Sequence, residues 1–203
     1  MLVLPVTVHI PSAHELPHRE DIEELLAKRK RANITQGFIT RPNKTLQLPF
    51  VFYADININN NRLWQLFTAL AGDMPAEVLC FYGLYEDEPV TTNYLPKQDV
   101  LKTLSSFEKE LTMDCLLEFG LRYHTKEMLT EIFVTESKYI KFCGSDKARL
   151  LQHMRDLNLN EVHDLAFIDE YPKTVRPLKH FIPTARRPED VIWSLNRAFG
   201  VEG

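Results

Sequence analysis

The sequence predicts one α/β domain spanning residues 1–203, in which helices pack on a mixed β-sheet made of a parallel β-α-β unit followed by an antiparallel meander. Two nearly continuous apolar runs, at 50–56 and 78–85, flank an amphipathic segment, as expected for buried parallel strands joined by a helix. Farther along, apolar and polar residues alternate between 115 and 124, which indicates a strand with one exposed face. The chain is 44% hydrophobic and 26% charged, which is typical of a globular domain.

The first 48 residues are predicted to contain a strand, a helix and a polar connection. Residues 3–10 are apolar and indicate a strand, because they are too few for a signal peptide or a membrane span and have no basic flank. The helix is expected from Pro17 to Ala32, with acidic residues in its first turn and the basic run 28–31 in its last turn. Since this order complements the helix dipole, we interpret the basic run as a solvated helix end rather than a nucleic-acid patch. The polar connection covers 33–48.

The parallel β-α-β unit is predicted from two apolar runs that enclose a helix. The runs are 50–56 (FVFYADI) and 78–85 (VLCFYGLY), each of the length and texture of a strand buried on both faces. Between them, residues 59–61 offer a helix cap, and Gly72 is placed to end the helix. The two strands should therefore be parallel, with a right-handed crossover.

The second half of the chain is predicted to combine helices with the antiparallel meander. Short polar turns separate the strands of the meander, as in consecutive hairpins. The expected elements are a helix from Pro96 through Leu111, strands at 115–124, 128–135 and 139–143, a helix at 146–157, a short strand at 165–168, and a last helix from Pro188 that Gly200 ends.

Composition and charge exclude several classes of protein. The net charge is −4, whereas a general nucleic-acid coat protein needs a dominant basic field. Cys80, Cys115 and Cys143 are far apart, and their spacing fits neither a zinc site nor a disulfide framework. We therefore expect no cofactor, no metal, no contact with nucleic acid or membrane, and a cytoplasmic location.

Residues 14–18 (HELPH) match the H-E-x-x-H pattern of zinc peptidases. That chemistry needs both histidines on one face of a helix, one turn apart, with the glutamate as general base. Pro17 lies between His14 and His18, and inside a helix it would remove a hydrogen bond and clash with the carbonyl group of Ala13. Because Pro17 suits the first turn of the following helix, we interpret 14–18 as a polar loop. A metal-dependent hydrolase that uses His14 and His18 is the alternative.

Residues 143–149 (CGSDKAR) have the C-x5-R spacing of cysteine phosphatases, between a predicted strand and a predicted helix. Such a loop must present backbone N–H groups to a phosphate dianion. Asp146 would place a carboxylate among those groups, and Phe142 stands where the histidine before the cysteine is usual. A helix N-cap explains the same residues. A phosphatase-like hydrolase that uses Cys143 and Arg149 is therefore a second alternative.

One set of polar residues has a physical argument for binding a partner. If the strands at 50–56 and 78–85 are parallel neighbours, the loops after them lie at one edge of the sheet, where ligands of open α/β sheets usually bind. An acidic recognition rim for a basic partner would form there. The other interpretation, in which 59–61 only cap a helix and the acidic side chains are solvated, stays open. The predicted contact residues are Asp55, Asn57, Tyr85, Glu86, Asp87 and Glu88, with Asp169, Glu170 and Tyr171 as a second group.

The chain resembles the small cytoplasmic immunity proteins that bacteria pair with secreted toxins. The resemblance lies in its acidic balance, its single domain, the lack of a convincing catalytic motif, and the loops at 85–89 (YEDEP) and 169–172 (DEYP). It implies tight binding to a cognate toxin, commonly by covering the active site of the toxin, so the expected partner is a basic toxin domain. A non-catalytic binding protein and a small hydrolase are the two function classes that stay open.

Overall fold

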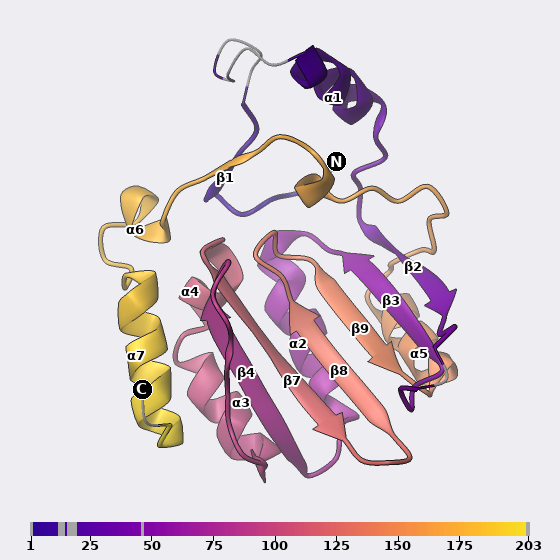
Figure 1. The fold of residues 1–203 in the computed structure, drawn as a ribbon, viewed down its shortest axis with the longest axis vertical. Coiled ribbons are helices and arrows are strands. Elements are labelled where there is room, and N and C mark those ends of the chain that lie inside the picture. The colour runs from indigo at the N-terminus through magenta and orange to yellow at the C-terminus, as the bar shows by residue number, and fades with distance from the viewer. Residues whose placement is uncertain (1, 12–14, 16–19, 46, 202–203) are drawn as a thin grey trace.

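The computed structural model describes residues 2–11, 15, 20–45 and 47–201. Its main feature is an eight-stranded sheet with the order β2-β3-β9-β8-β7-β4-β5, in which β6 pairs with β4 beside β5 (Figure 1). All neighbouring strands in it are antiparallel. The strands are β2 (Gly37–Pro42), β3 (Phe52–Asn57), β4 (Glu77–Leu84), β5 (Val90–Thr91), β6 (Leu95–Pro96), β7 (Leu117–His124), β8 (Leu129–Val134) and β9 (Ile140–Gly144).

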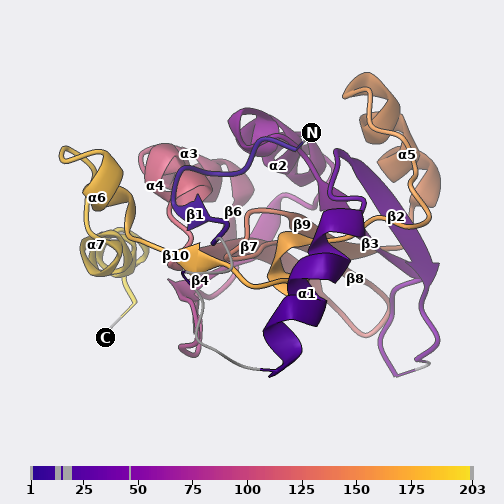
Figure 2. The same cartoon turned by 90° about the horizontal axis from the view of Figure 1, so that it is seen from above.

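Four helices cover one face of this sheet, and a fifth lies beside β4 (Figure 2). The amphipathic α2 illustrates why they pack there, because Leu63, Leu66, Phe67 and Leu70 recur at helical spacing and are all buried. Among the described residues, no helix is both long and apolar enough to cross a membrane. The helices on the covered face are α2 (Leu63–Gly72), preceded by the 3-10 turn Asn60–Arg62, α3 (Lys97–Ser105), α4 (Glu108–Met113) and α5 (Lys147–Asp156), and the fifth is α7 (Pro188–Phe199).

Segments from both ends of the chain meet beyond one end of the main sheet (Figure 1). There β1 (Val8–His9) pairs with β10 (Thr174–Val175) in a separate two-stranded antiparallel sheet. The helix α1 (Glu20–Arg31) lies beyond them, and α6 (Leu178–Phe181) leads into α7. None of these short elements pairs with the strands of the main sheet in the described part of the chain, and hydrogen bonds of Thr7 and Leu178 to the turn before β7 help to hold them there.

The predicted mixed sheet and its parallel β-α-β unit are wrong, because all neighbouring strands of the main sheet are antiparallel. The strands β3 and β4 are not neighbours, because β9, β8 and β7 lie between them. Four antiparallel steps leave β3 and β4 pointing in the same direction, but separate them by roughly 19 Å at the usual spacing of strands. The apolar runs misled the prediction because only one face of β3 is covered: Phe52 and Ala54 face the core, whereas Tyr53 between them is 37% exposed.

The prediction of the antiparallel meander and of most helices is confirmed. The strands β7, β8 and β9 pair consecutively, and α5 and α7 lie at the predicted positions. Gly200 ends α7 in a left-handed conformation with φ of 66°, as the sequence predicts. The helix predicted from Pro96 is divided into α3 and α4, because the chain turns at Ser106 and Phe107.

Of three other predictions, two are only partly correct and one is wrong. The strand predicted at 3–10 is reduced to β1. The strand predicted at 165–168 is wrong, because Leu165 makes only an isolated bridge to Asn33 and a 3-10 turn follows at Ile168–Glu170. The basic last turn of α1 is present, but the guanidinium group of Arg29 donates to the carbonyl groups of Pro11 and Pro172 at 3.2 Å instead of being solvated.

A turn between α4 and β7 fixes both chain ends to the main sheet. The carboxylate of Asp114 is fully buried and accepts hydrogen bonds from the backbone N–H groups of Leu116, at 3.0 Å, and Leu178, at 2.8 Å. The hydroxyl of Thr7 donates to the carbonyl group of Met113 at 2.5 Å and accepts from the N–H group of Cys115. The N-terminal segment and the segment before α6 are therefore joined at one buried point.

The hairpin between β8 and β9 carries a second set of buried charges. The ammonium group of Lys138 donates to the carbonyl group of Leu117 at 2.6 Å, and burial lowers the pKa of this lysine. The carboxylate of Glu136 pairs with Lys173 at 2.7 Å and accepts from the hydroxyl of Ser137. Burial raises the pKa of Glu136, but the hydrogen bonds from Lys173 and Ser137 outweigh it, so that the pKa lies below its ordinary value.

The tight packing around Gly120 predicts that adding a methyl group at this position lowers the stability of the fold. A Cβ atom on Gly120 of β7 would overlap the ring of Phe81 and the carbonyl oxygen of Ile132, whereas one on Gly72 would meet nothing within 4 Å. We expect Gly120→Ala to lower the free energy of unfolding by about 1–3 kcal/mol, because a backbone oxygen cannot move aside. Gly72→Ala, at the end of α2, should be neutral or stabilise by up to ~1 kcal/mol. Urea unfolding of both variants checks this, and equal stabilities would contradict it.

The ion pair between Glu136 and Lys173 predicts a pH dependence of stability. Because the folded state lowers the pKa of Glu136, its stabilising contribution is present above the ordinary value of 4.5 and lost as the pH falls through the lower folded pKa. We expect Glu136→Gln to cost about 1–3 kcal/mol at pH 7 and progressively less below pH ~4.5. Urea unfolding at pH 7 and pH 3 measures the difference, with the exposed Glu127→Gln as control. A cost that is the same at both pH values would contradict the assignment.

Candidate functional site

The turn after β4 is acidic and exposed, and we call residues 85–88 the acidic turn. Tyr85 is 45% exposed, and Glu86, Asp87 and Glu88 are exposed without an ion-pair partner among the described residues. Two hydrogen bonds fix the backbone of the turn. The N–H group of Tyr85 donates to the carbonyl group of residue 116 at 2.9 Å, and the N–H group of Asp87 donates to the carbonyl group of residue 84 at 3.1 Å. Glu86 has φ of 75°, a left-handed conformation that costs a non-glycine residue roughly 1–2 kcal/mol.

A close approach of two backbone segments supports the acidic turn from behind. A Cβ atom on Gly83 would lie 3.1 Å from the Cα atom of Pro89, tighter than ordinary van der Waals contact, so glycine favours the fold-back of the chain at this distance. The four side chains of the acidic turn thus project from a constrained backbone rather than from a loose loop.

The predicted rim does not form, because Asp55 and Asn57 lie elsewhere and are already engaged. Asp55 is on the sheet face opposite the helices, where its carboxylate pairs with the guanidinium group of Arg41 at 2.7 Å. Asn57 is buried, and its side-chain amide donates to the carbonyl group of Ala166 at 3.0 Å. Since three strands separate β3 from β4, neither residue reaches the acidic turn.

Two residues of the second predicted group, at 169–171, accept hydrogen bonds from other residues of the protein. Asp169 accepts a hydrogen bond from the hydroxyl of Tyr139 at 2.9 Å, and burial together with Asp169 raises the pKa of Tyr139. The carboxylate of Glu170 accepts from the backbone N–H group of Phe167 at 3.3 Å. Tyr171 is half-buried, and burial raises its pKa. These residues stabilise the segment that crosses the end of β9, so they are less available to a partner.

The phosphatase-like arrangement of Cys143 and Arg149 is contradicted by the geometry. Phe142 faces the helices, so Cys143, the next residue in β9, points to the opposite face of the sheet, opposite Glu131. Arg149 lies on α5 on the helical face and binds Asp73. Burial and the neighbouring Glu131 raise the pKa of Cys143 to about 12, the opposite of what a nucleophilic thiolate needs.

The zinc-peptidase interpretation falls outside the described residues, because His14, Pro17 and His18 are not among them. Within the described residues, no group of three or more histidine, cysteine, aspartate or glutamate side chains is arranged to hold a metal ion.

A polar cluster that the sequence did not reveal lies between α2 and α5. The carboxylate of Asp73 accepts from the guanidinium group of Arg149 at 2.9 Å and contacts the imidazole of His153 at 2.5 Å. Burial acts to raise the pKa of Asp73, but these hydrogen bonds outweigh burial, so the pKa lies below its ordinary value. The cluster borders a cavity of about 300 Å³ with an apolar floor that includes Leu70 and Phe142. Because its three polar residues are up to 80 positions apart, no spacing motif could have indicated it.

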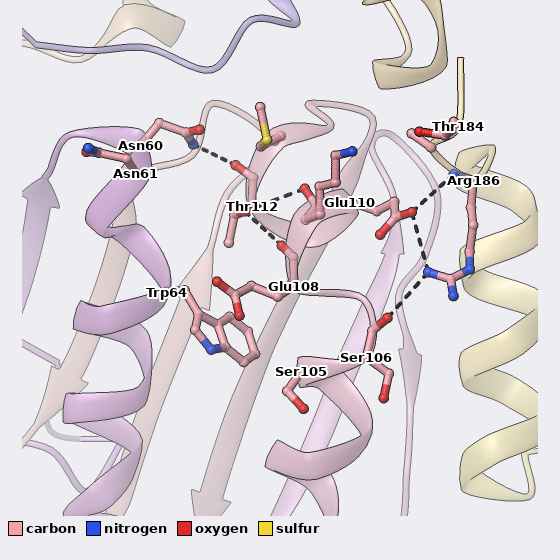
Figure 3. A pocket seen from close by; sticks show the side chains of 13 residues that line it. Asn60, Asn61, Trp64, Ser105, Ser106, Glu108, Glu110, Thr112, Thr184 and Arg186 are labelled. Atoms are coloured by element: carbon pink, nitrogen blue, oxygen red, sulfur yellow. Dashed lines mark hydrogen bonds and ion pairs between the residues drawn. The ribbon is translucent and has the colours of Figure 1, made fainter. Parts of the chain in front are cut away.

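A larger groove, of about 590 Å³, opens on the helical face around α4 (Figure 3). On one side of α4, Trp64 of α2 and the carboxylate of Glu108 point toward one another. On the other side, Glu110 is only 5% exposed and accepts from the backbone N–H group of Arg186, at 3.1 Å, and from its guanidinium group, at 3.4 Å. Asn60 closes the upper end of the groove by donating to the carbonyl group of residue 112 at 2.6 Å. We call this cavity the Trp64 groove.

Comparisons with known proteins identify no relative for the chain. No protein-family model, no curated protein and no solved structure matches it. The acidic turn and the Trp64 groove are therefore assessed by their own chemistry, because no relative supplies functional residues.

The environment of Cys143 predicts slow reaction with thiol reagents. A pKa of about 12 leaves almost no thiolate at neutral pH, and burial also raises the pKa values of Cys80 and Cys115. We expect the native protein to react with Ellman's reagent at pH 7.5 at least about a hundredfold more slowly than after denaturation in urea, when three thiols should be counted. One thiol that reacts quickly in the native state and disappears in Cys143→Ser would contradict this assignment.

Proposed function

We propose that the chain is a non-catalytic binding protein that neutralises a basic toxin domain by direct contact, in the manner of a cytoplasmic immunity protein. The observation that carries the proposal is the acidic turn, where three adjacent carboxylates and Tyr85 are exposed on a constrained backbone. A net charge of −4 favours association with a basic partner over a nucleic acid.

The acidic turn suits recognition because its charges are not used by the fold. Asp55, Asp169 and Glu110 are each bound by a residue from another element, whereas Glu86, Asp87 and Glu88 have no such partner among the described residues. Unpaired charges of one sign raise the rate of encounter with a partner of the opposite sign. Their constrained backbone also lowers the entropy lost when a partner binds.

Tyr85 adds a contact that does not depend on charge. A tyrosine side chain combines a large apolar ring with a hydroxyl group and has few rotamers to lose, so tyrosine is frequent at the centre of interfaces. Tyr85 next to three carboxylates therefore suits the role of an anchor for a basic surface that also offers an apolar patch.

The proposal predicts that charge reversal in the acidic turn slows binding without unfolding the protein. We expect Glu86→Lys combined with Asp87→Lys to change the free energy of unfolding by under about 0.5 kcal/mol, since both side chains are exposed. Association with a basic partner should slow by about tenfold at low salt, with a smaller effect at high salt. The measurement is surface plasmon resonance across salt concentrations with a partner identified by co-purification.

The matched control reverses two charges at the opposite end of the strands from the acidic turn. Glu77 begins β4 and Glu127 lies in the turn between β7 and β8, and both are exposed. Glu77→Lys with Glu127→Lys makes the same change in net charge, so it separates a local effect from a general one. If the partner binds the acidic-turn variant as fast as the wild type, the acidic turn is not the contact.

A further inference from the structure

On one side of the Trp64 groove, two side chains keep polar groups that have no partner among the described residues. The rings of Phe67 and Phe119 support the indole of Trp64 from the core, at centroid distances of 5.3 and 6.3 Å. Phe119 is fully buried, whereas Trp64 is partly exposed and lines the groove. Its indole N–H group has no hydrogen-bond partner among the described residues, and it is not a buried unsatisfied group. The indole therefore offers a supported aromatic surface to a ligand.

Glu108 supplies a carboxylate beside this indole. It is the first residue of α4, is exposed, and has no ion-pair partner among the described residues. Figure 3 shows its side chain extending from α4 toward Trp64. Glu110, two residues farther on, faces the other side of α4 and is bound by Arg186, whose guanidinium group also lies 4.9 Å from the ring of Phe107.

The cations at the groove do not neutralise Glu108. Arg186 is engaged by Glu110 and by the carbonyl group of Ser106 at 3.3 Å. Lys109 follows Glu108 directly on α4, so its side chain leaves the helix about 100° away from that of Glu108. The place between Trp64 and Glu108 thus combines an aromatic face and a free carboxylate, which is the chemistry that recognises a cation.

We propose that the Trp64 groove receives an arginine side chain of the basic partner. This inference rests on the proposed function. The planar guanidinium group stacks on the indole of Trp64 while its N–H groups donate to the carboxylate of Glu108. Arginine fits better than lysine because its flat, forked group can stack and form two parallel hydrogen bonds at once. The groove would then anchor a specific side chain, and the acidic turn would attract the basic surface around it.

The proposal can be tested on the isolated protein with a small probe. The chain has two tryptophans, and Trp193 is 63% exposed on α7, so Trp193→Phe leaves Trp64 as the only indole reporter. N-acetyl-arginine methylamide should change the Trp64 fluorescence saturably, with half-saturation on the order of 1–10 mM at constant ionic strength. The uncharged N-acetyl-citrulline methylamide, which has nearly the same shape, should produce no saturable change.

Two variants on α4 complete the test. Glu108→Gln in the Trp193→Phe background should weaken binding of the arginine probe about fivefold to tenfold, because the carboxylate is lost while the side-chain shape is kept. Lys109→Gln, one residue away, should bind the probe at least as well as its parent. Equal responses to the arginine and citrulline probes, or a Glu108→Gln variant with unchanged affinity, would overturn the assignment of the groove. Since this test needs no partner, its failure is distinguishable from failure of the acidic turn in the binding experiment.

Discussion

The buried carboxylate of Asp114 organises the end of the molecule where both proposed contacts lie. By accepting N–H groups from Leu116 and Leu178, it fixes the turn between α4 and β7 and joins it to the C-terminal segment. The same turn reaches both contact sites: the carbonyl group of Leu116 accepts from Tyr85 of the acidic turn, and Met113 lines the Trp64 groove. A single buried charge therefore sets the position of two surfaces that belong to different parts of the sequence.

This connection also limits how far apart the two contacts can be. Thr112, at the groove, lies only four positions before Leu116, which holds the acidic turn, so the connecting backbone spans at most about 14 Å. An interface of standard size, roughly 800 Å² on each partner, covers more than that distance. One basic protein could thus contact the acidic turn and the groove together. The acidic turn would then speed association, and the groove would lengthen the lifetime of the complex.

The sequence was sufficient for the local elements and insufficient for their order in the sheet. Helical spacing identified α5 and α7, and alternation in 115–124 identified a half-exposed strand, because these signals depend on near neighbours. The position of β3 relative to β4 depends on where a later meander inserts, and no local pattern encodes that. The rim failed for this reason, whereas the acidic turn survived because its residues are consecutive. The pairing of Trp64 with Glu108, across 44 positions, had no local signal either.

The distribution of paired and unpaired charges separates residues that hold the fold from residues that can serve a partner. The side chains of Glu136 and Lys173 are largely buried, where an unpaired charge would cost several kcal/mol, so their pairing stabilises the fold. Glu86 and Glu108 lie in water, where an unpaired carboxylate costs the fold almost nothing. A surface charge left unpaired on fixed backbone keeps its full attraction for a ligand. That distinction, rather than acidity as such, selects the acidic turn and the Trp64 groove over Asp55 and Asp169.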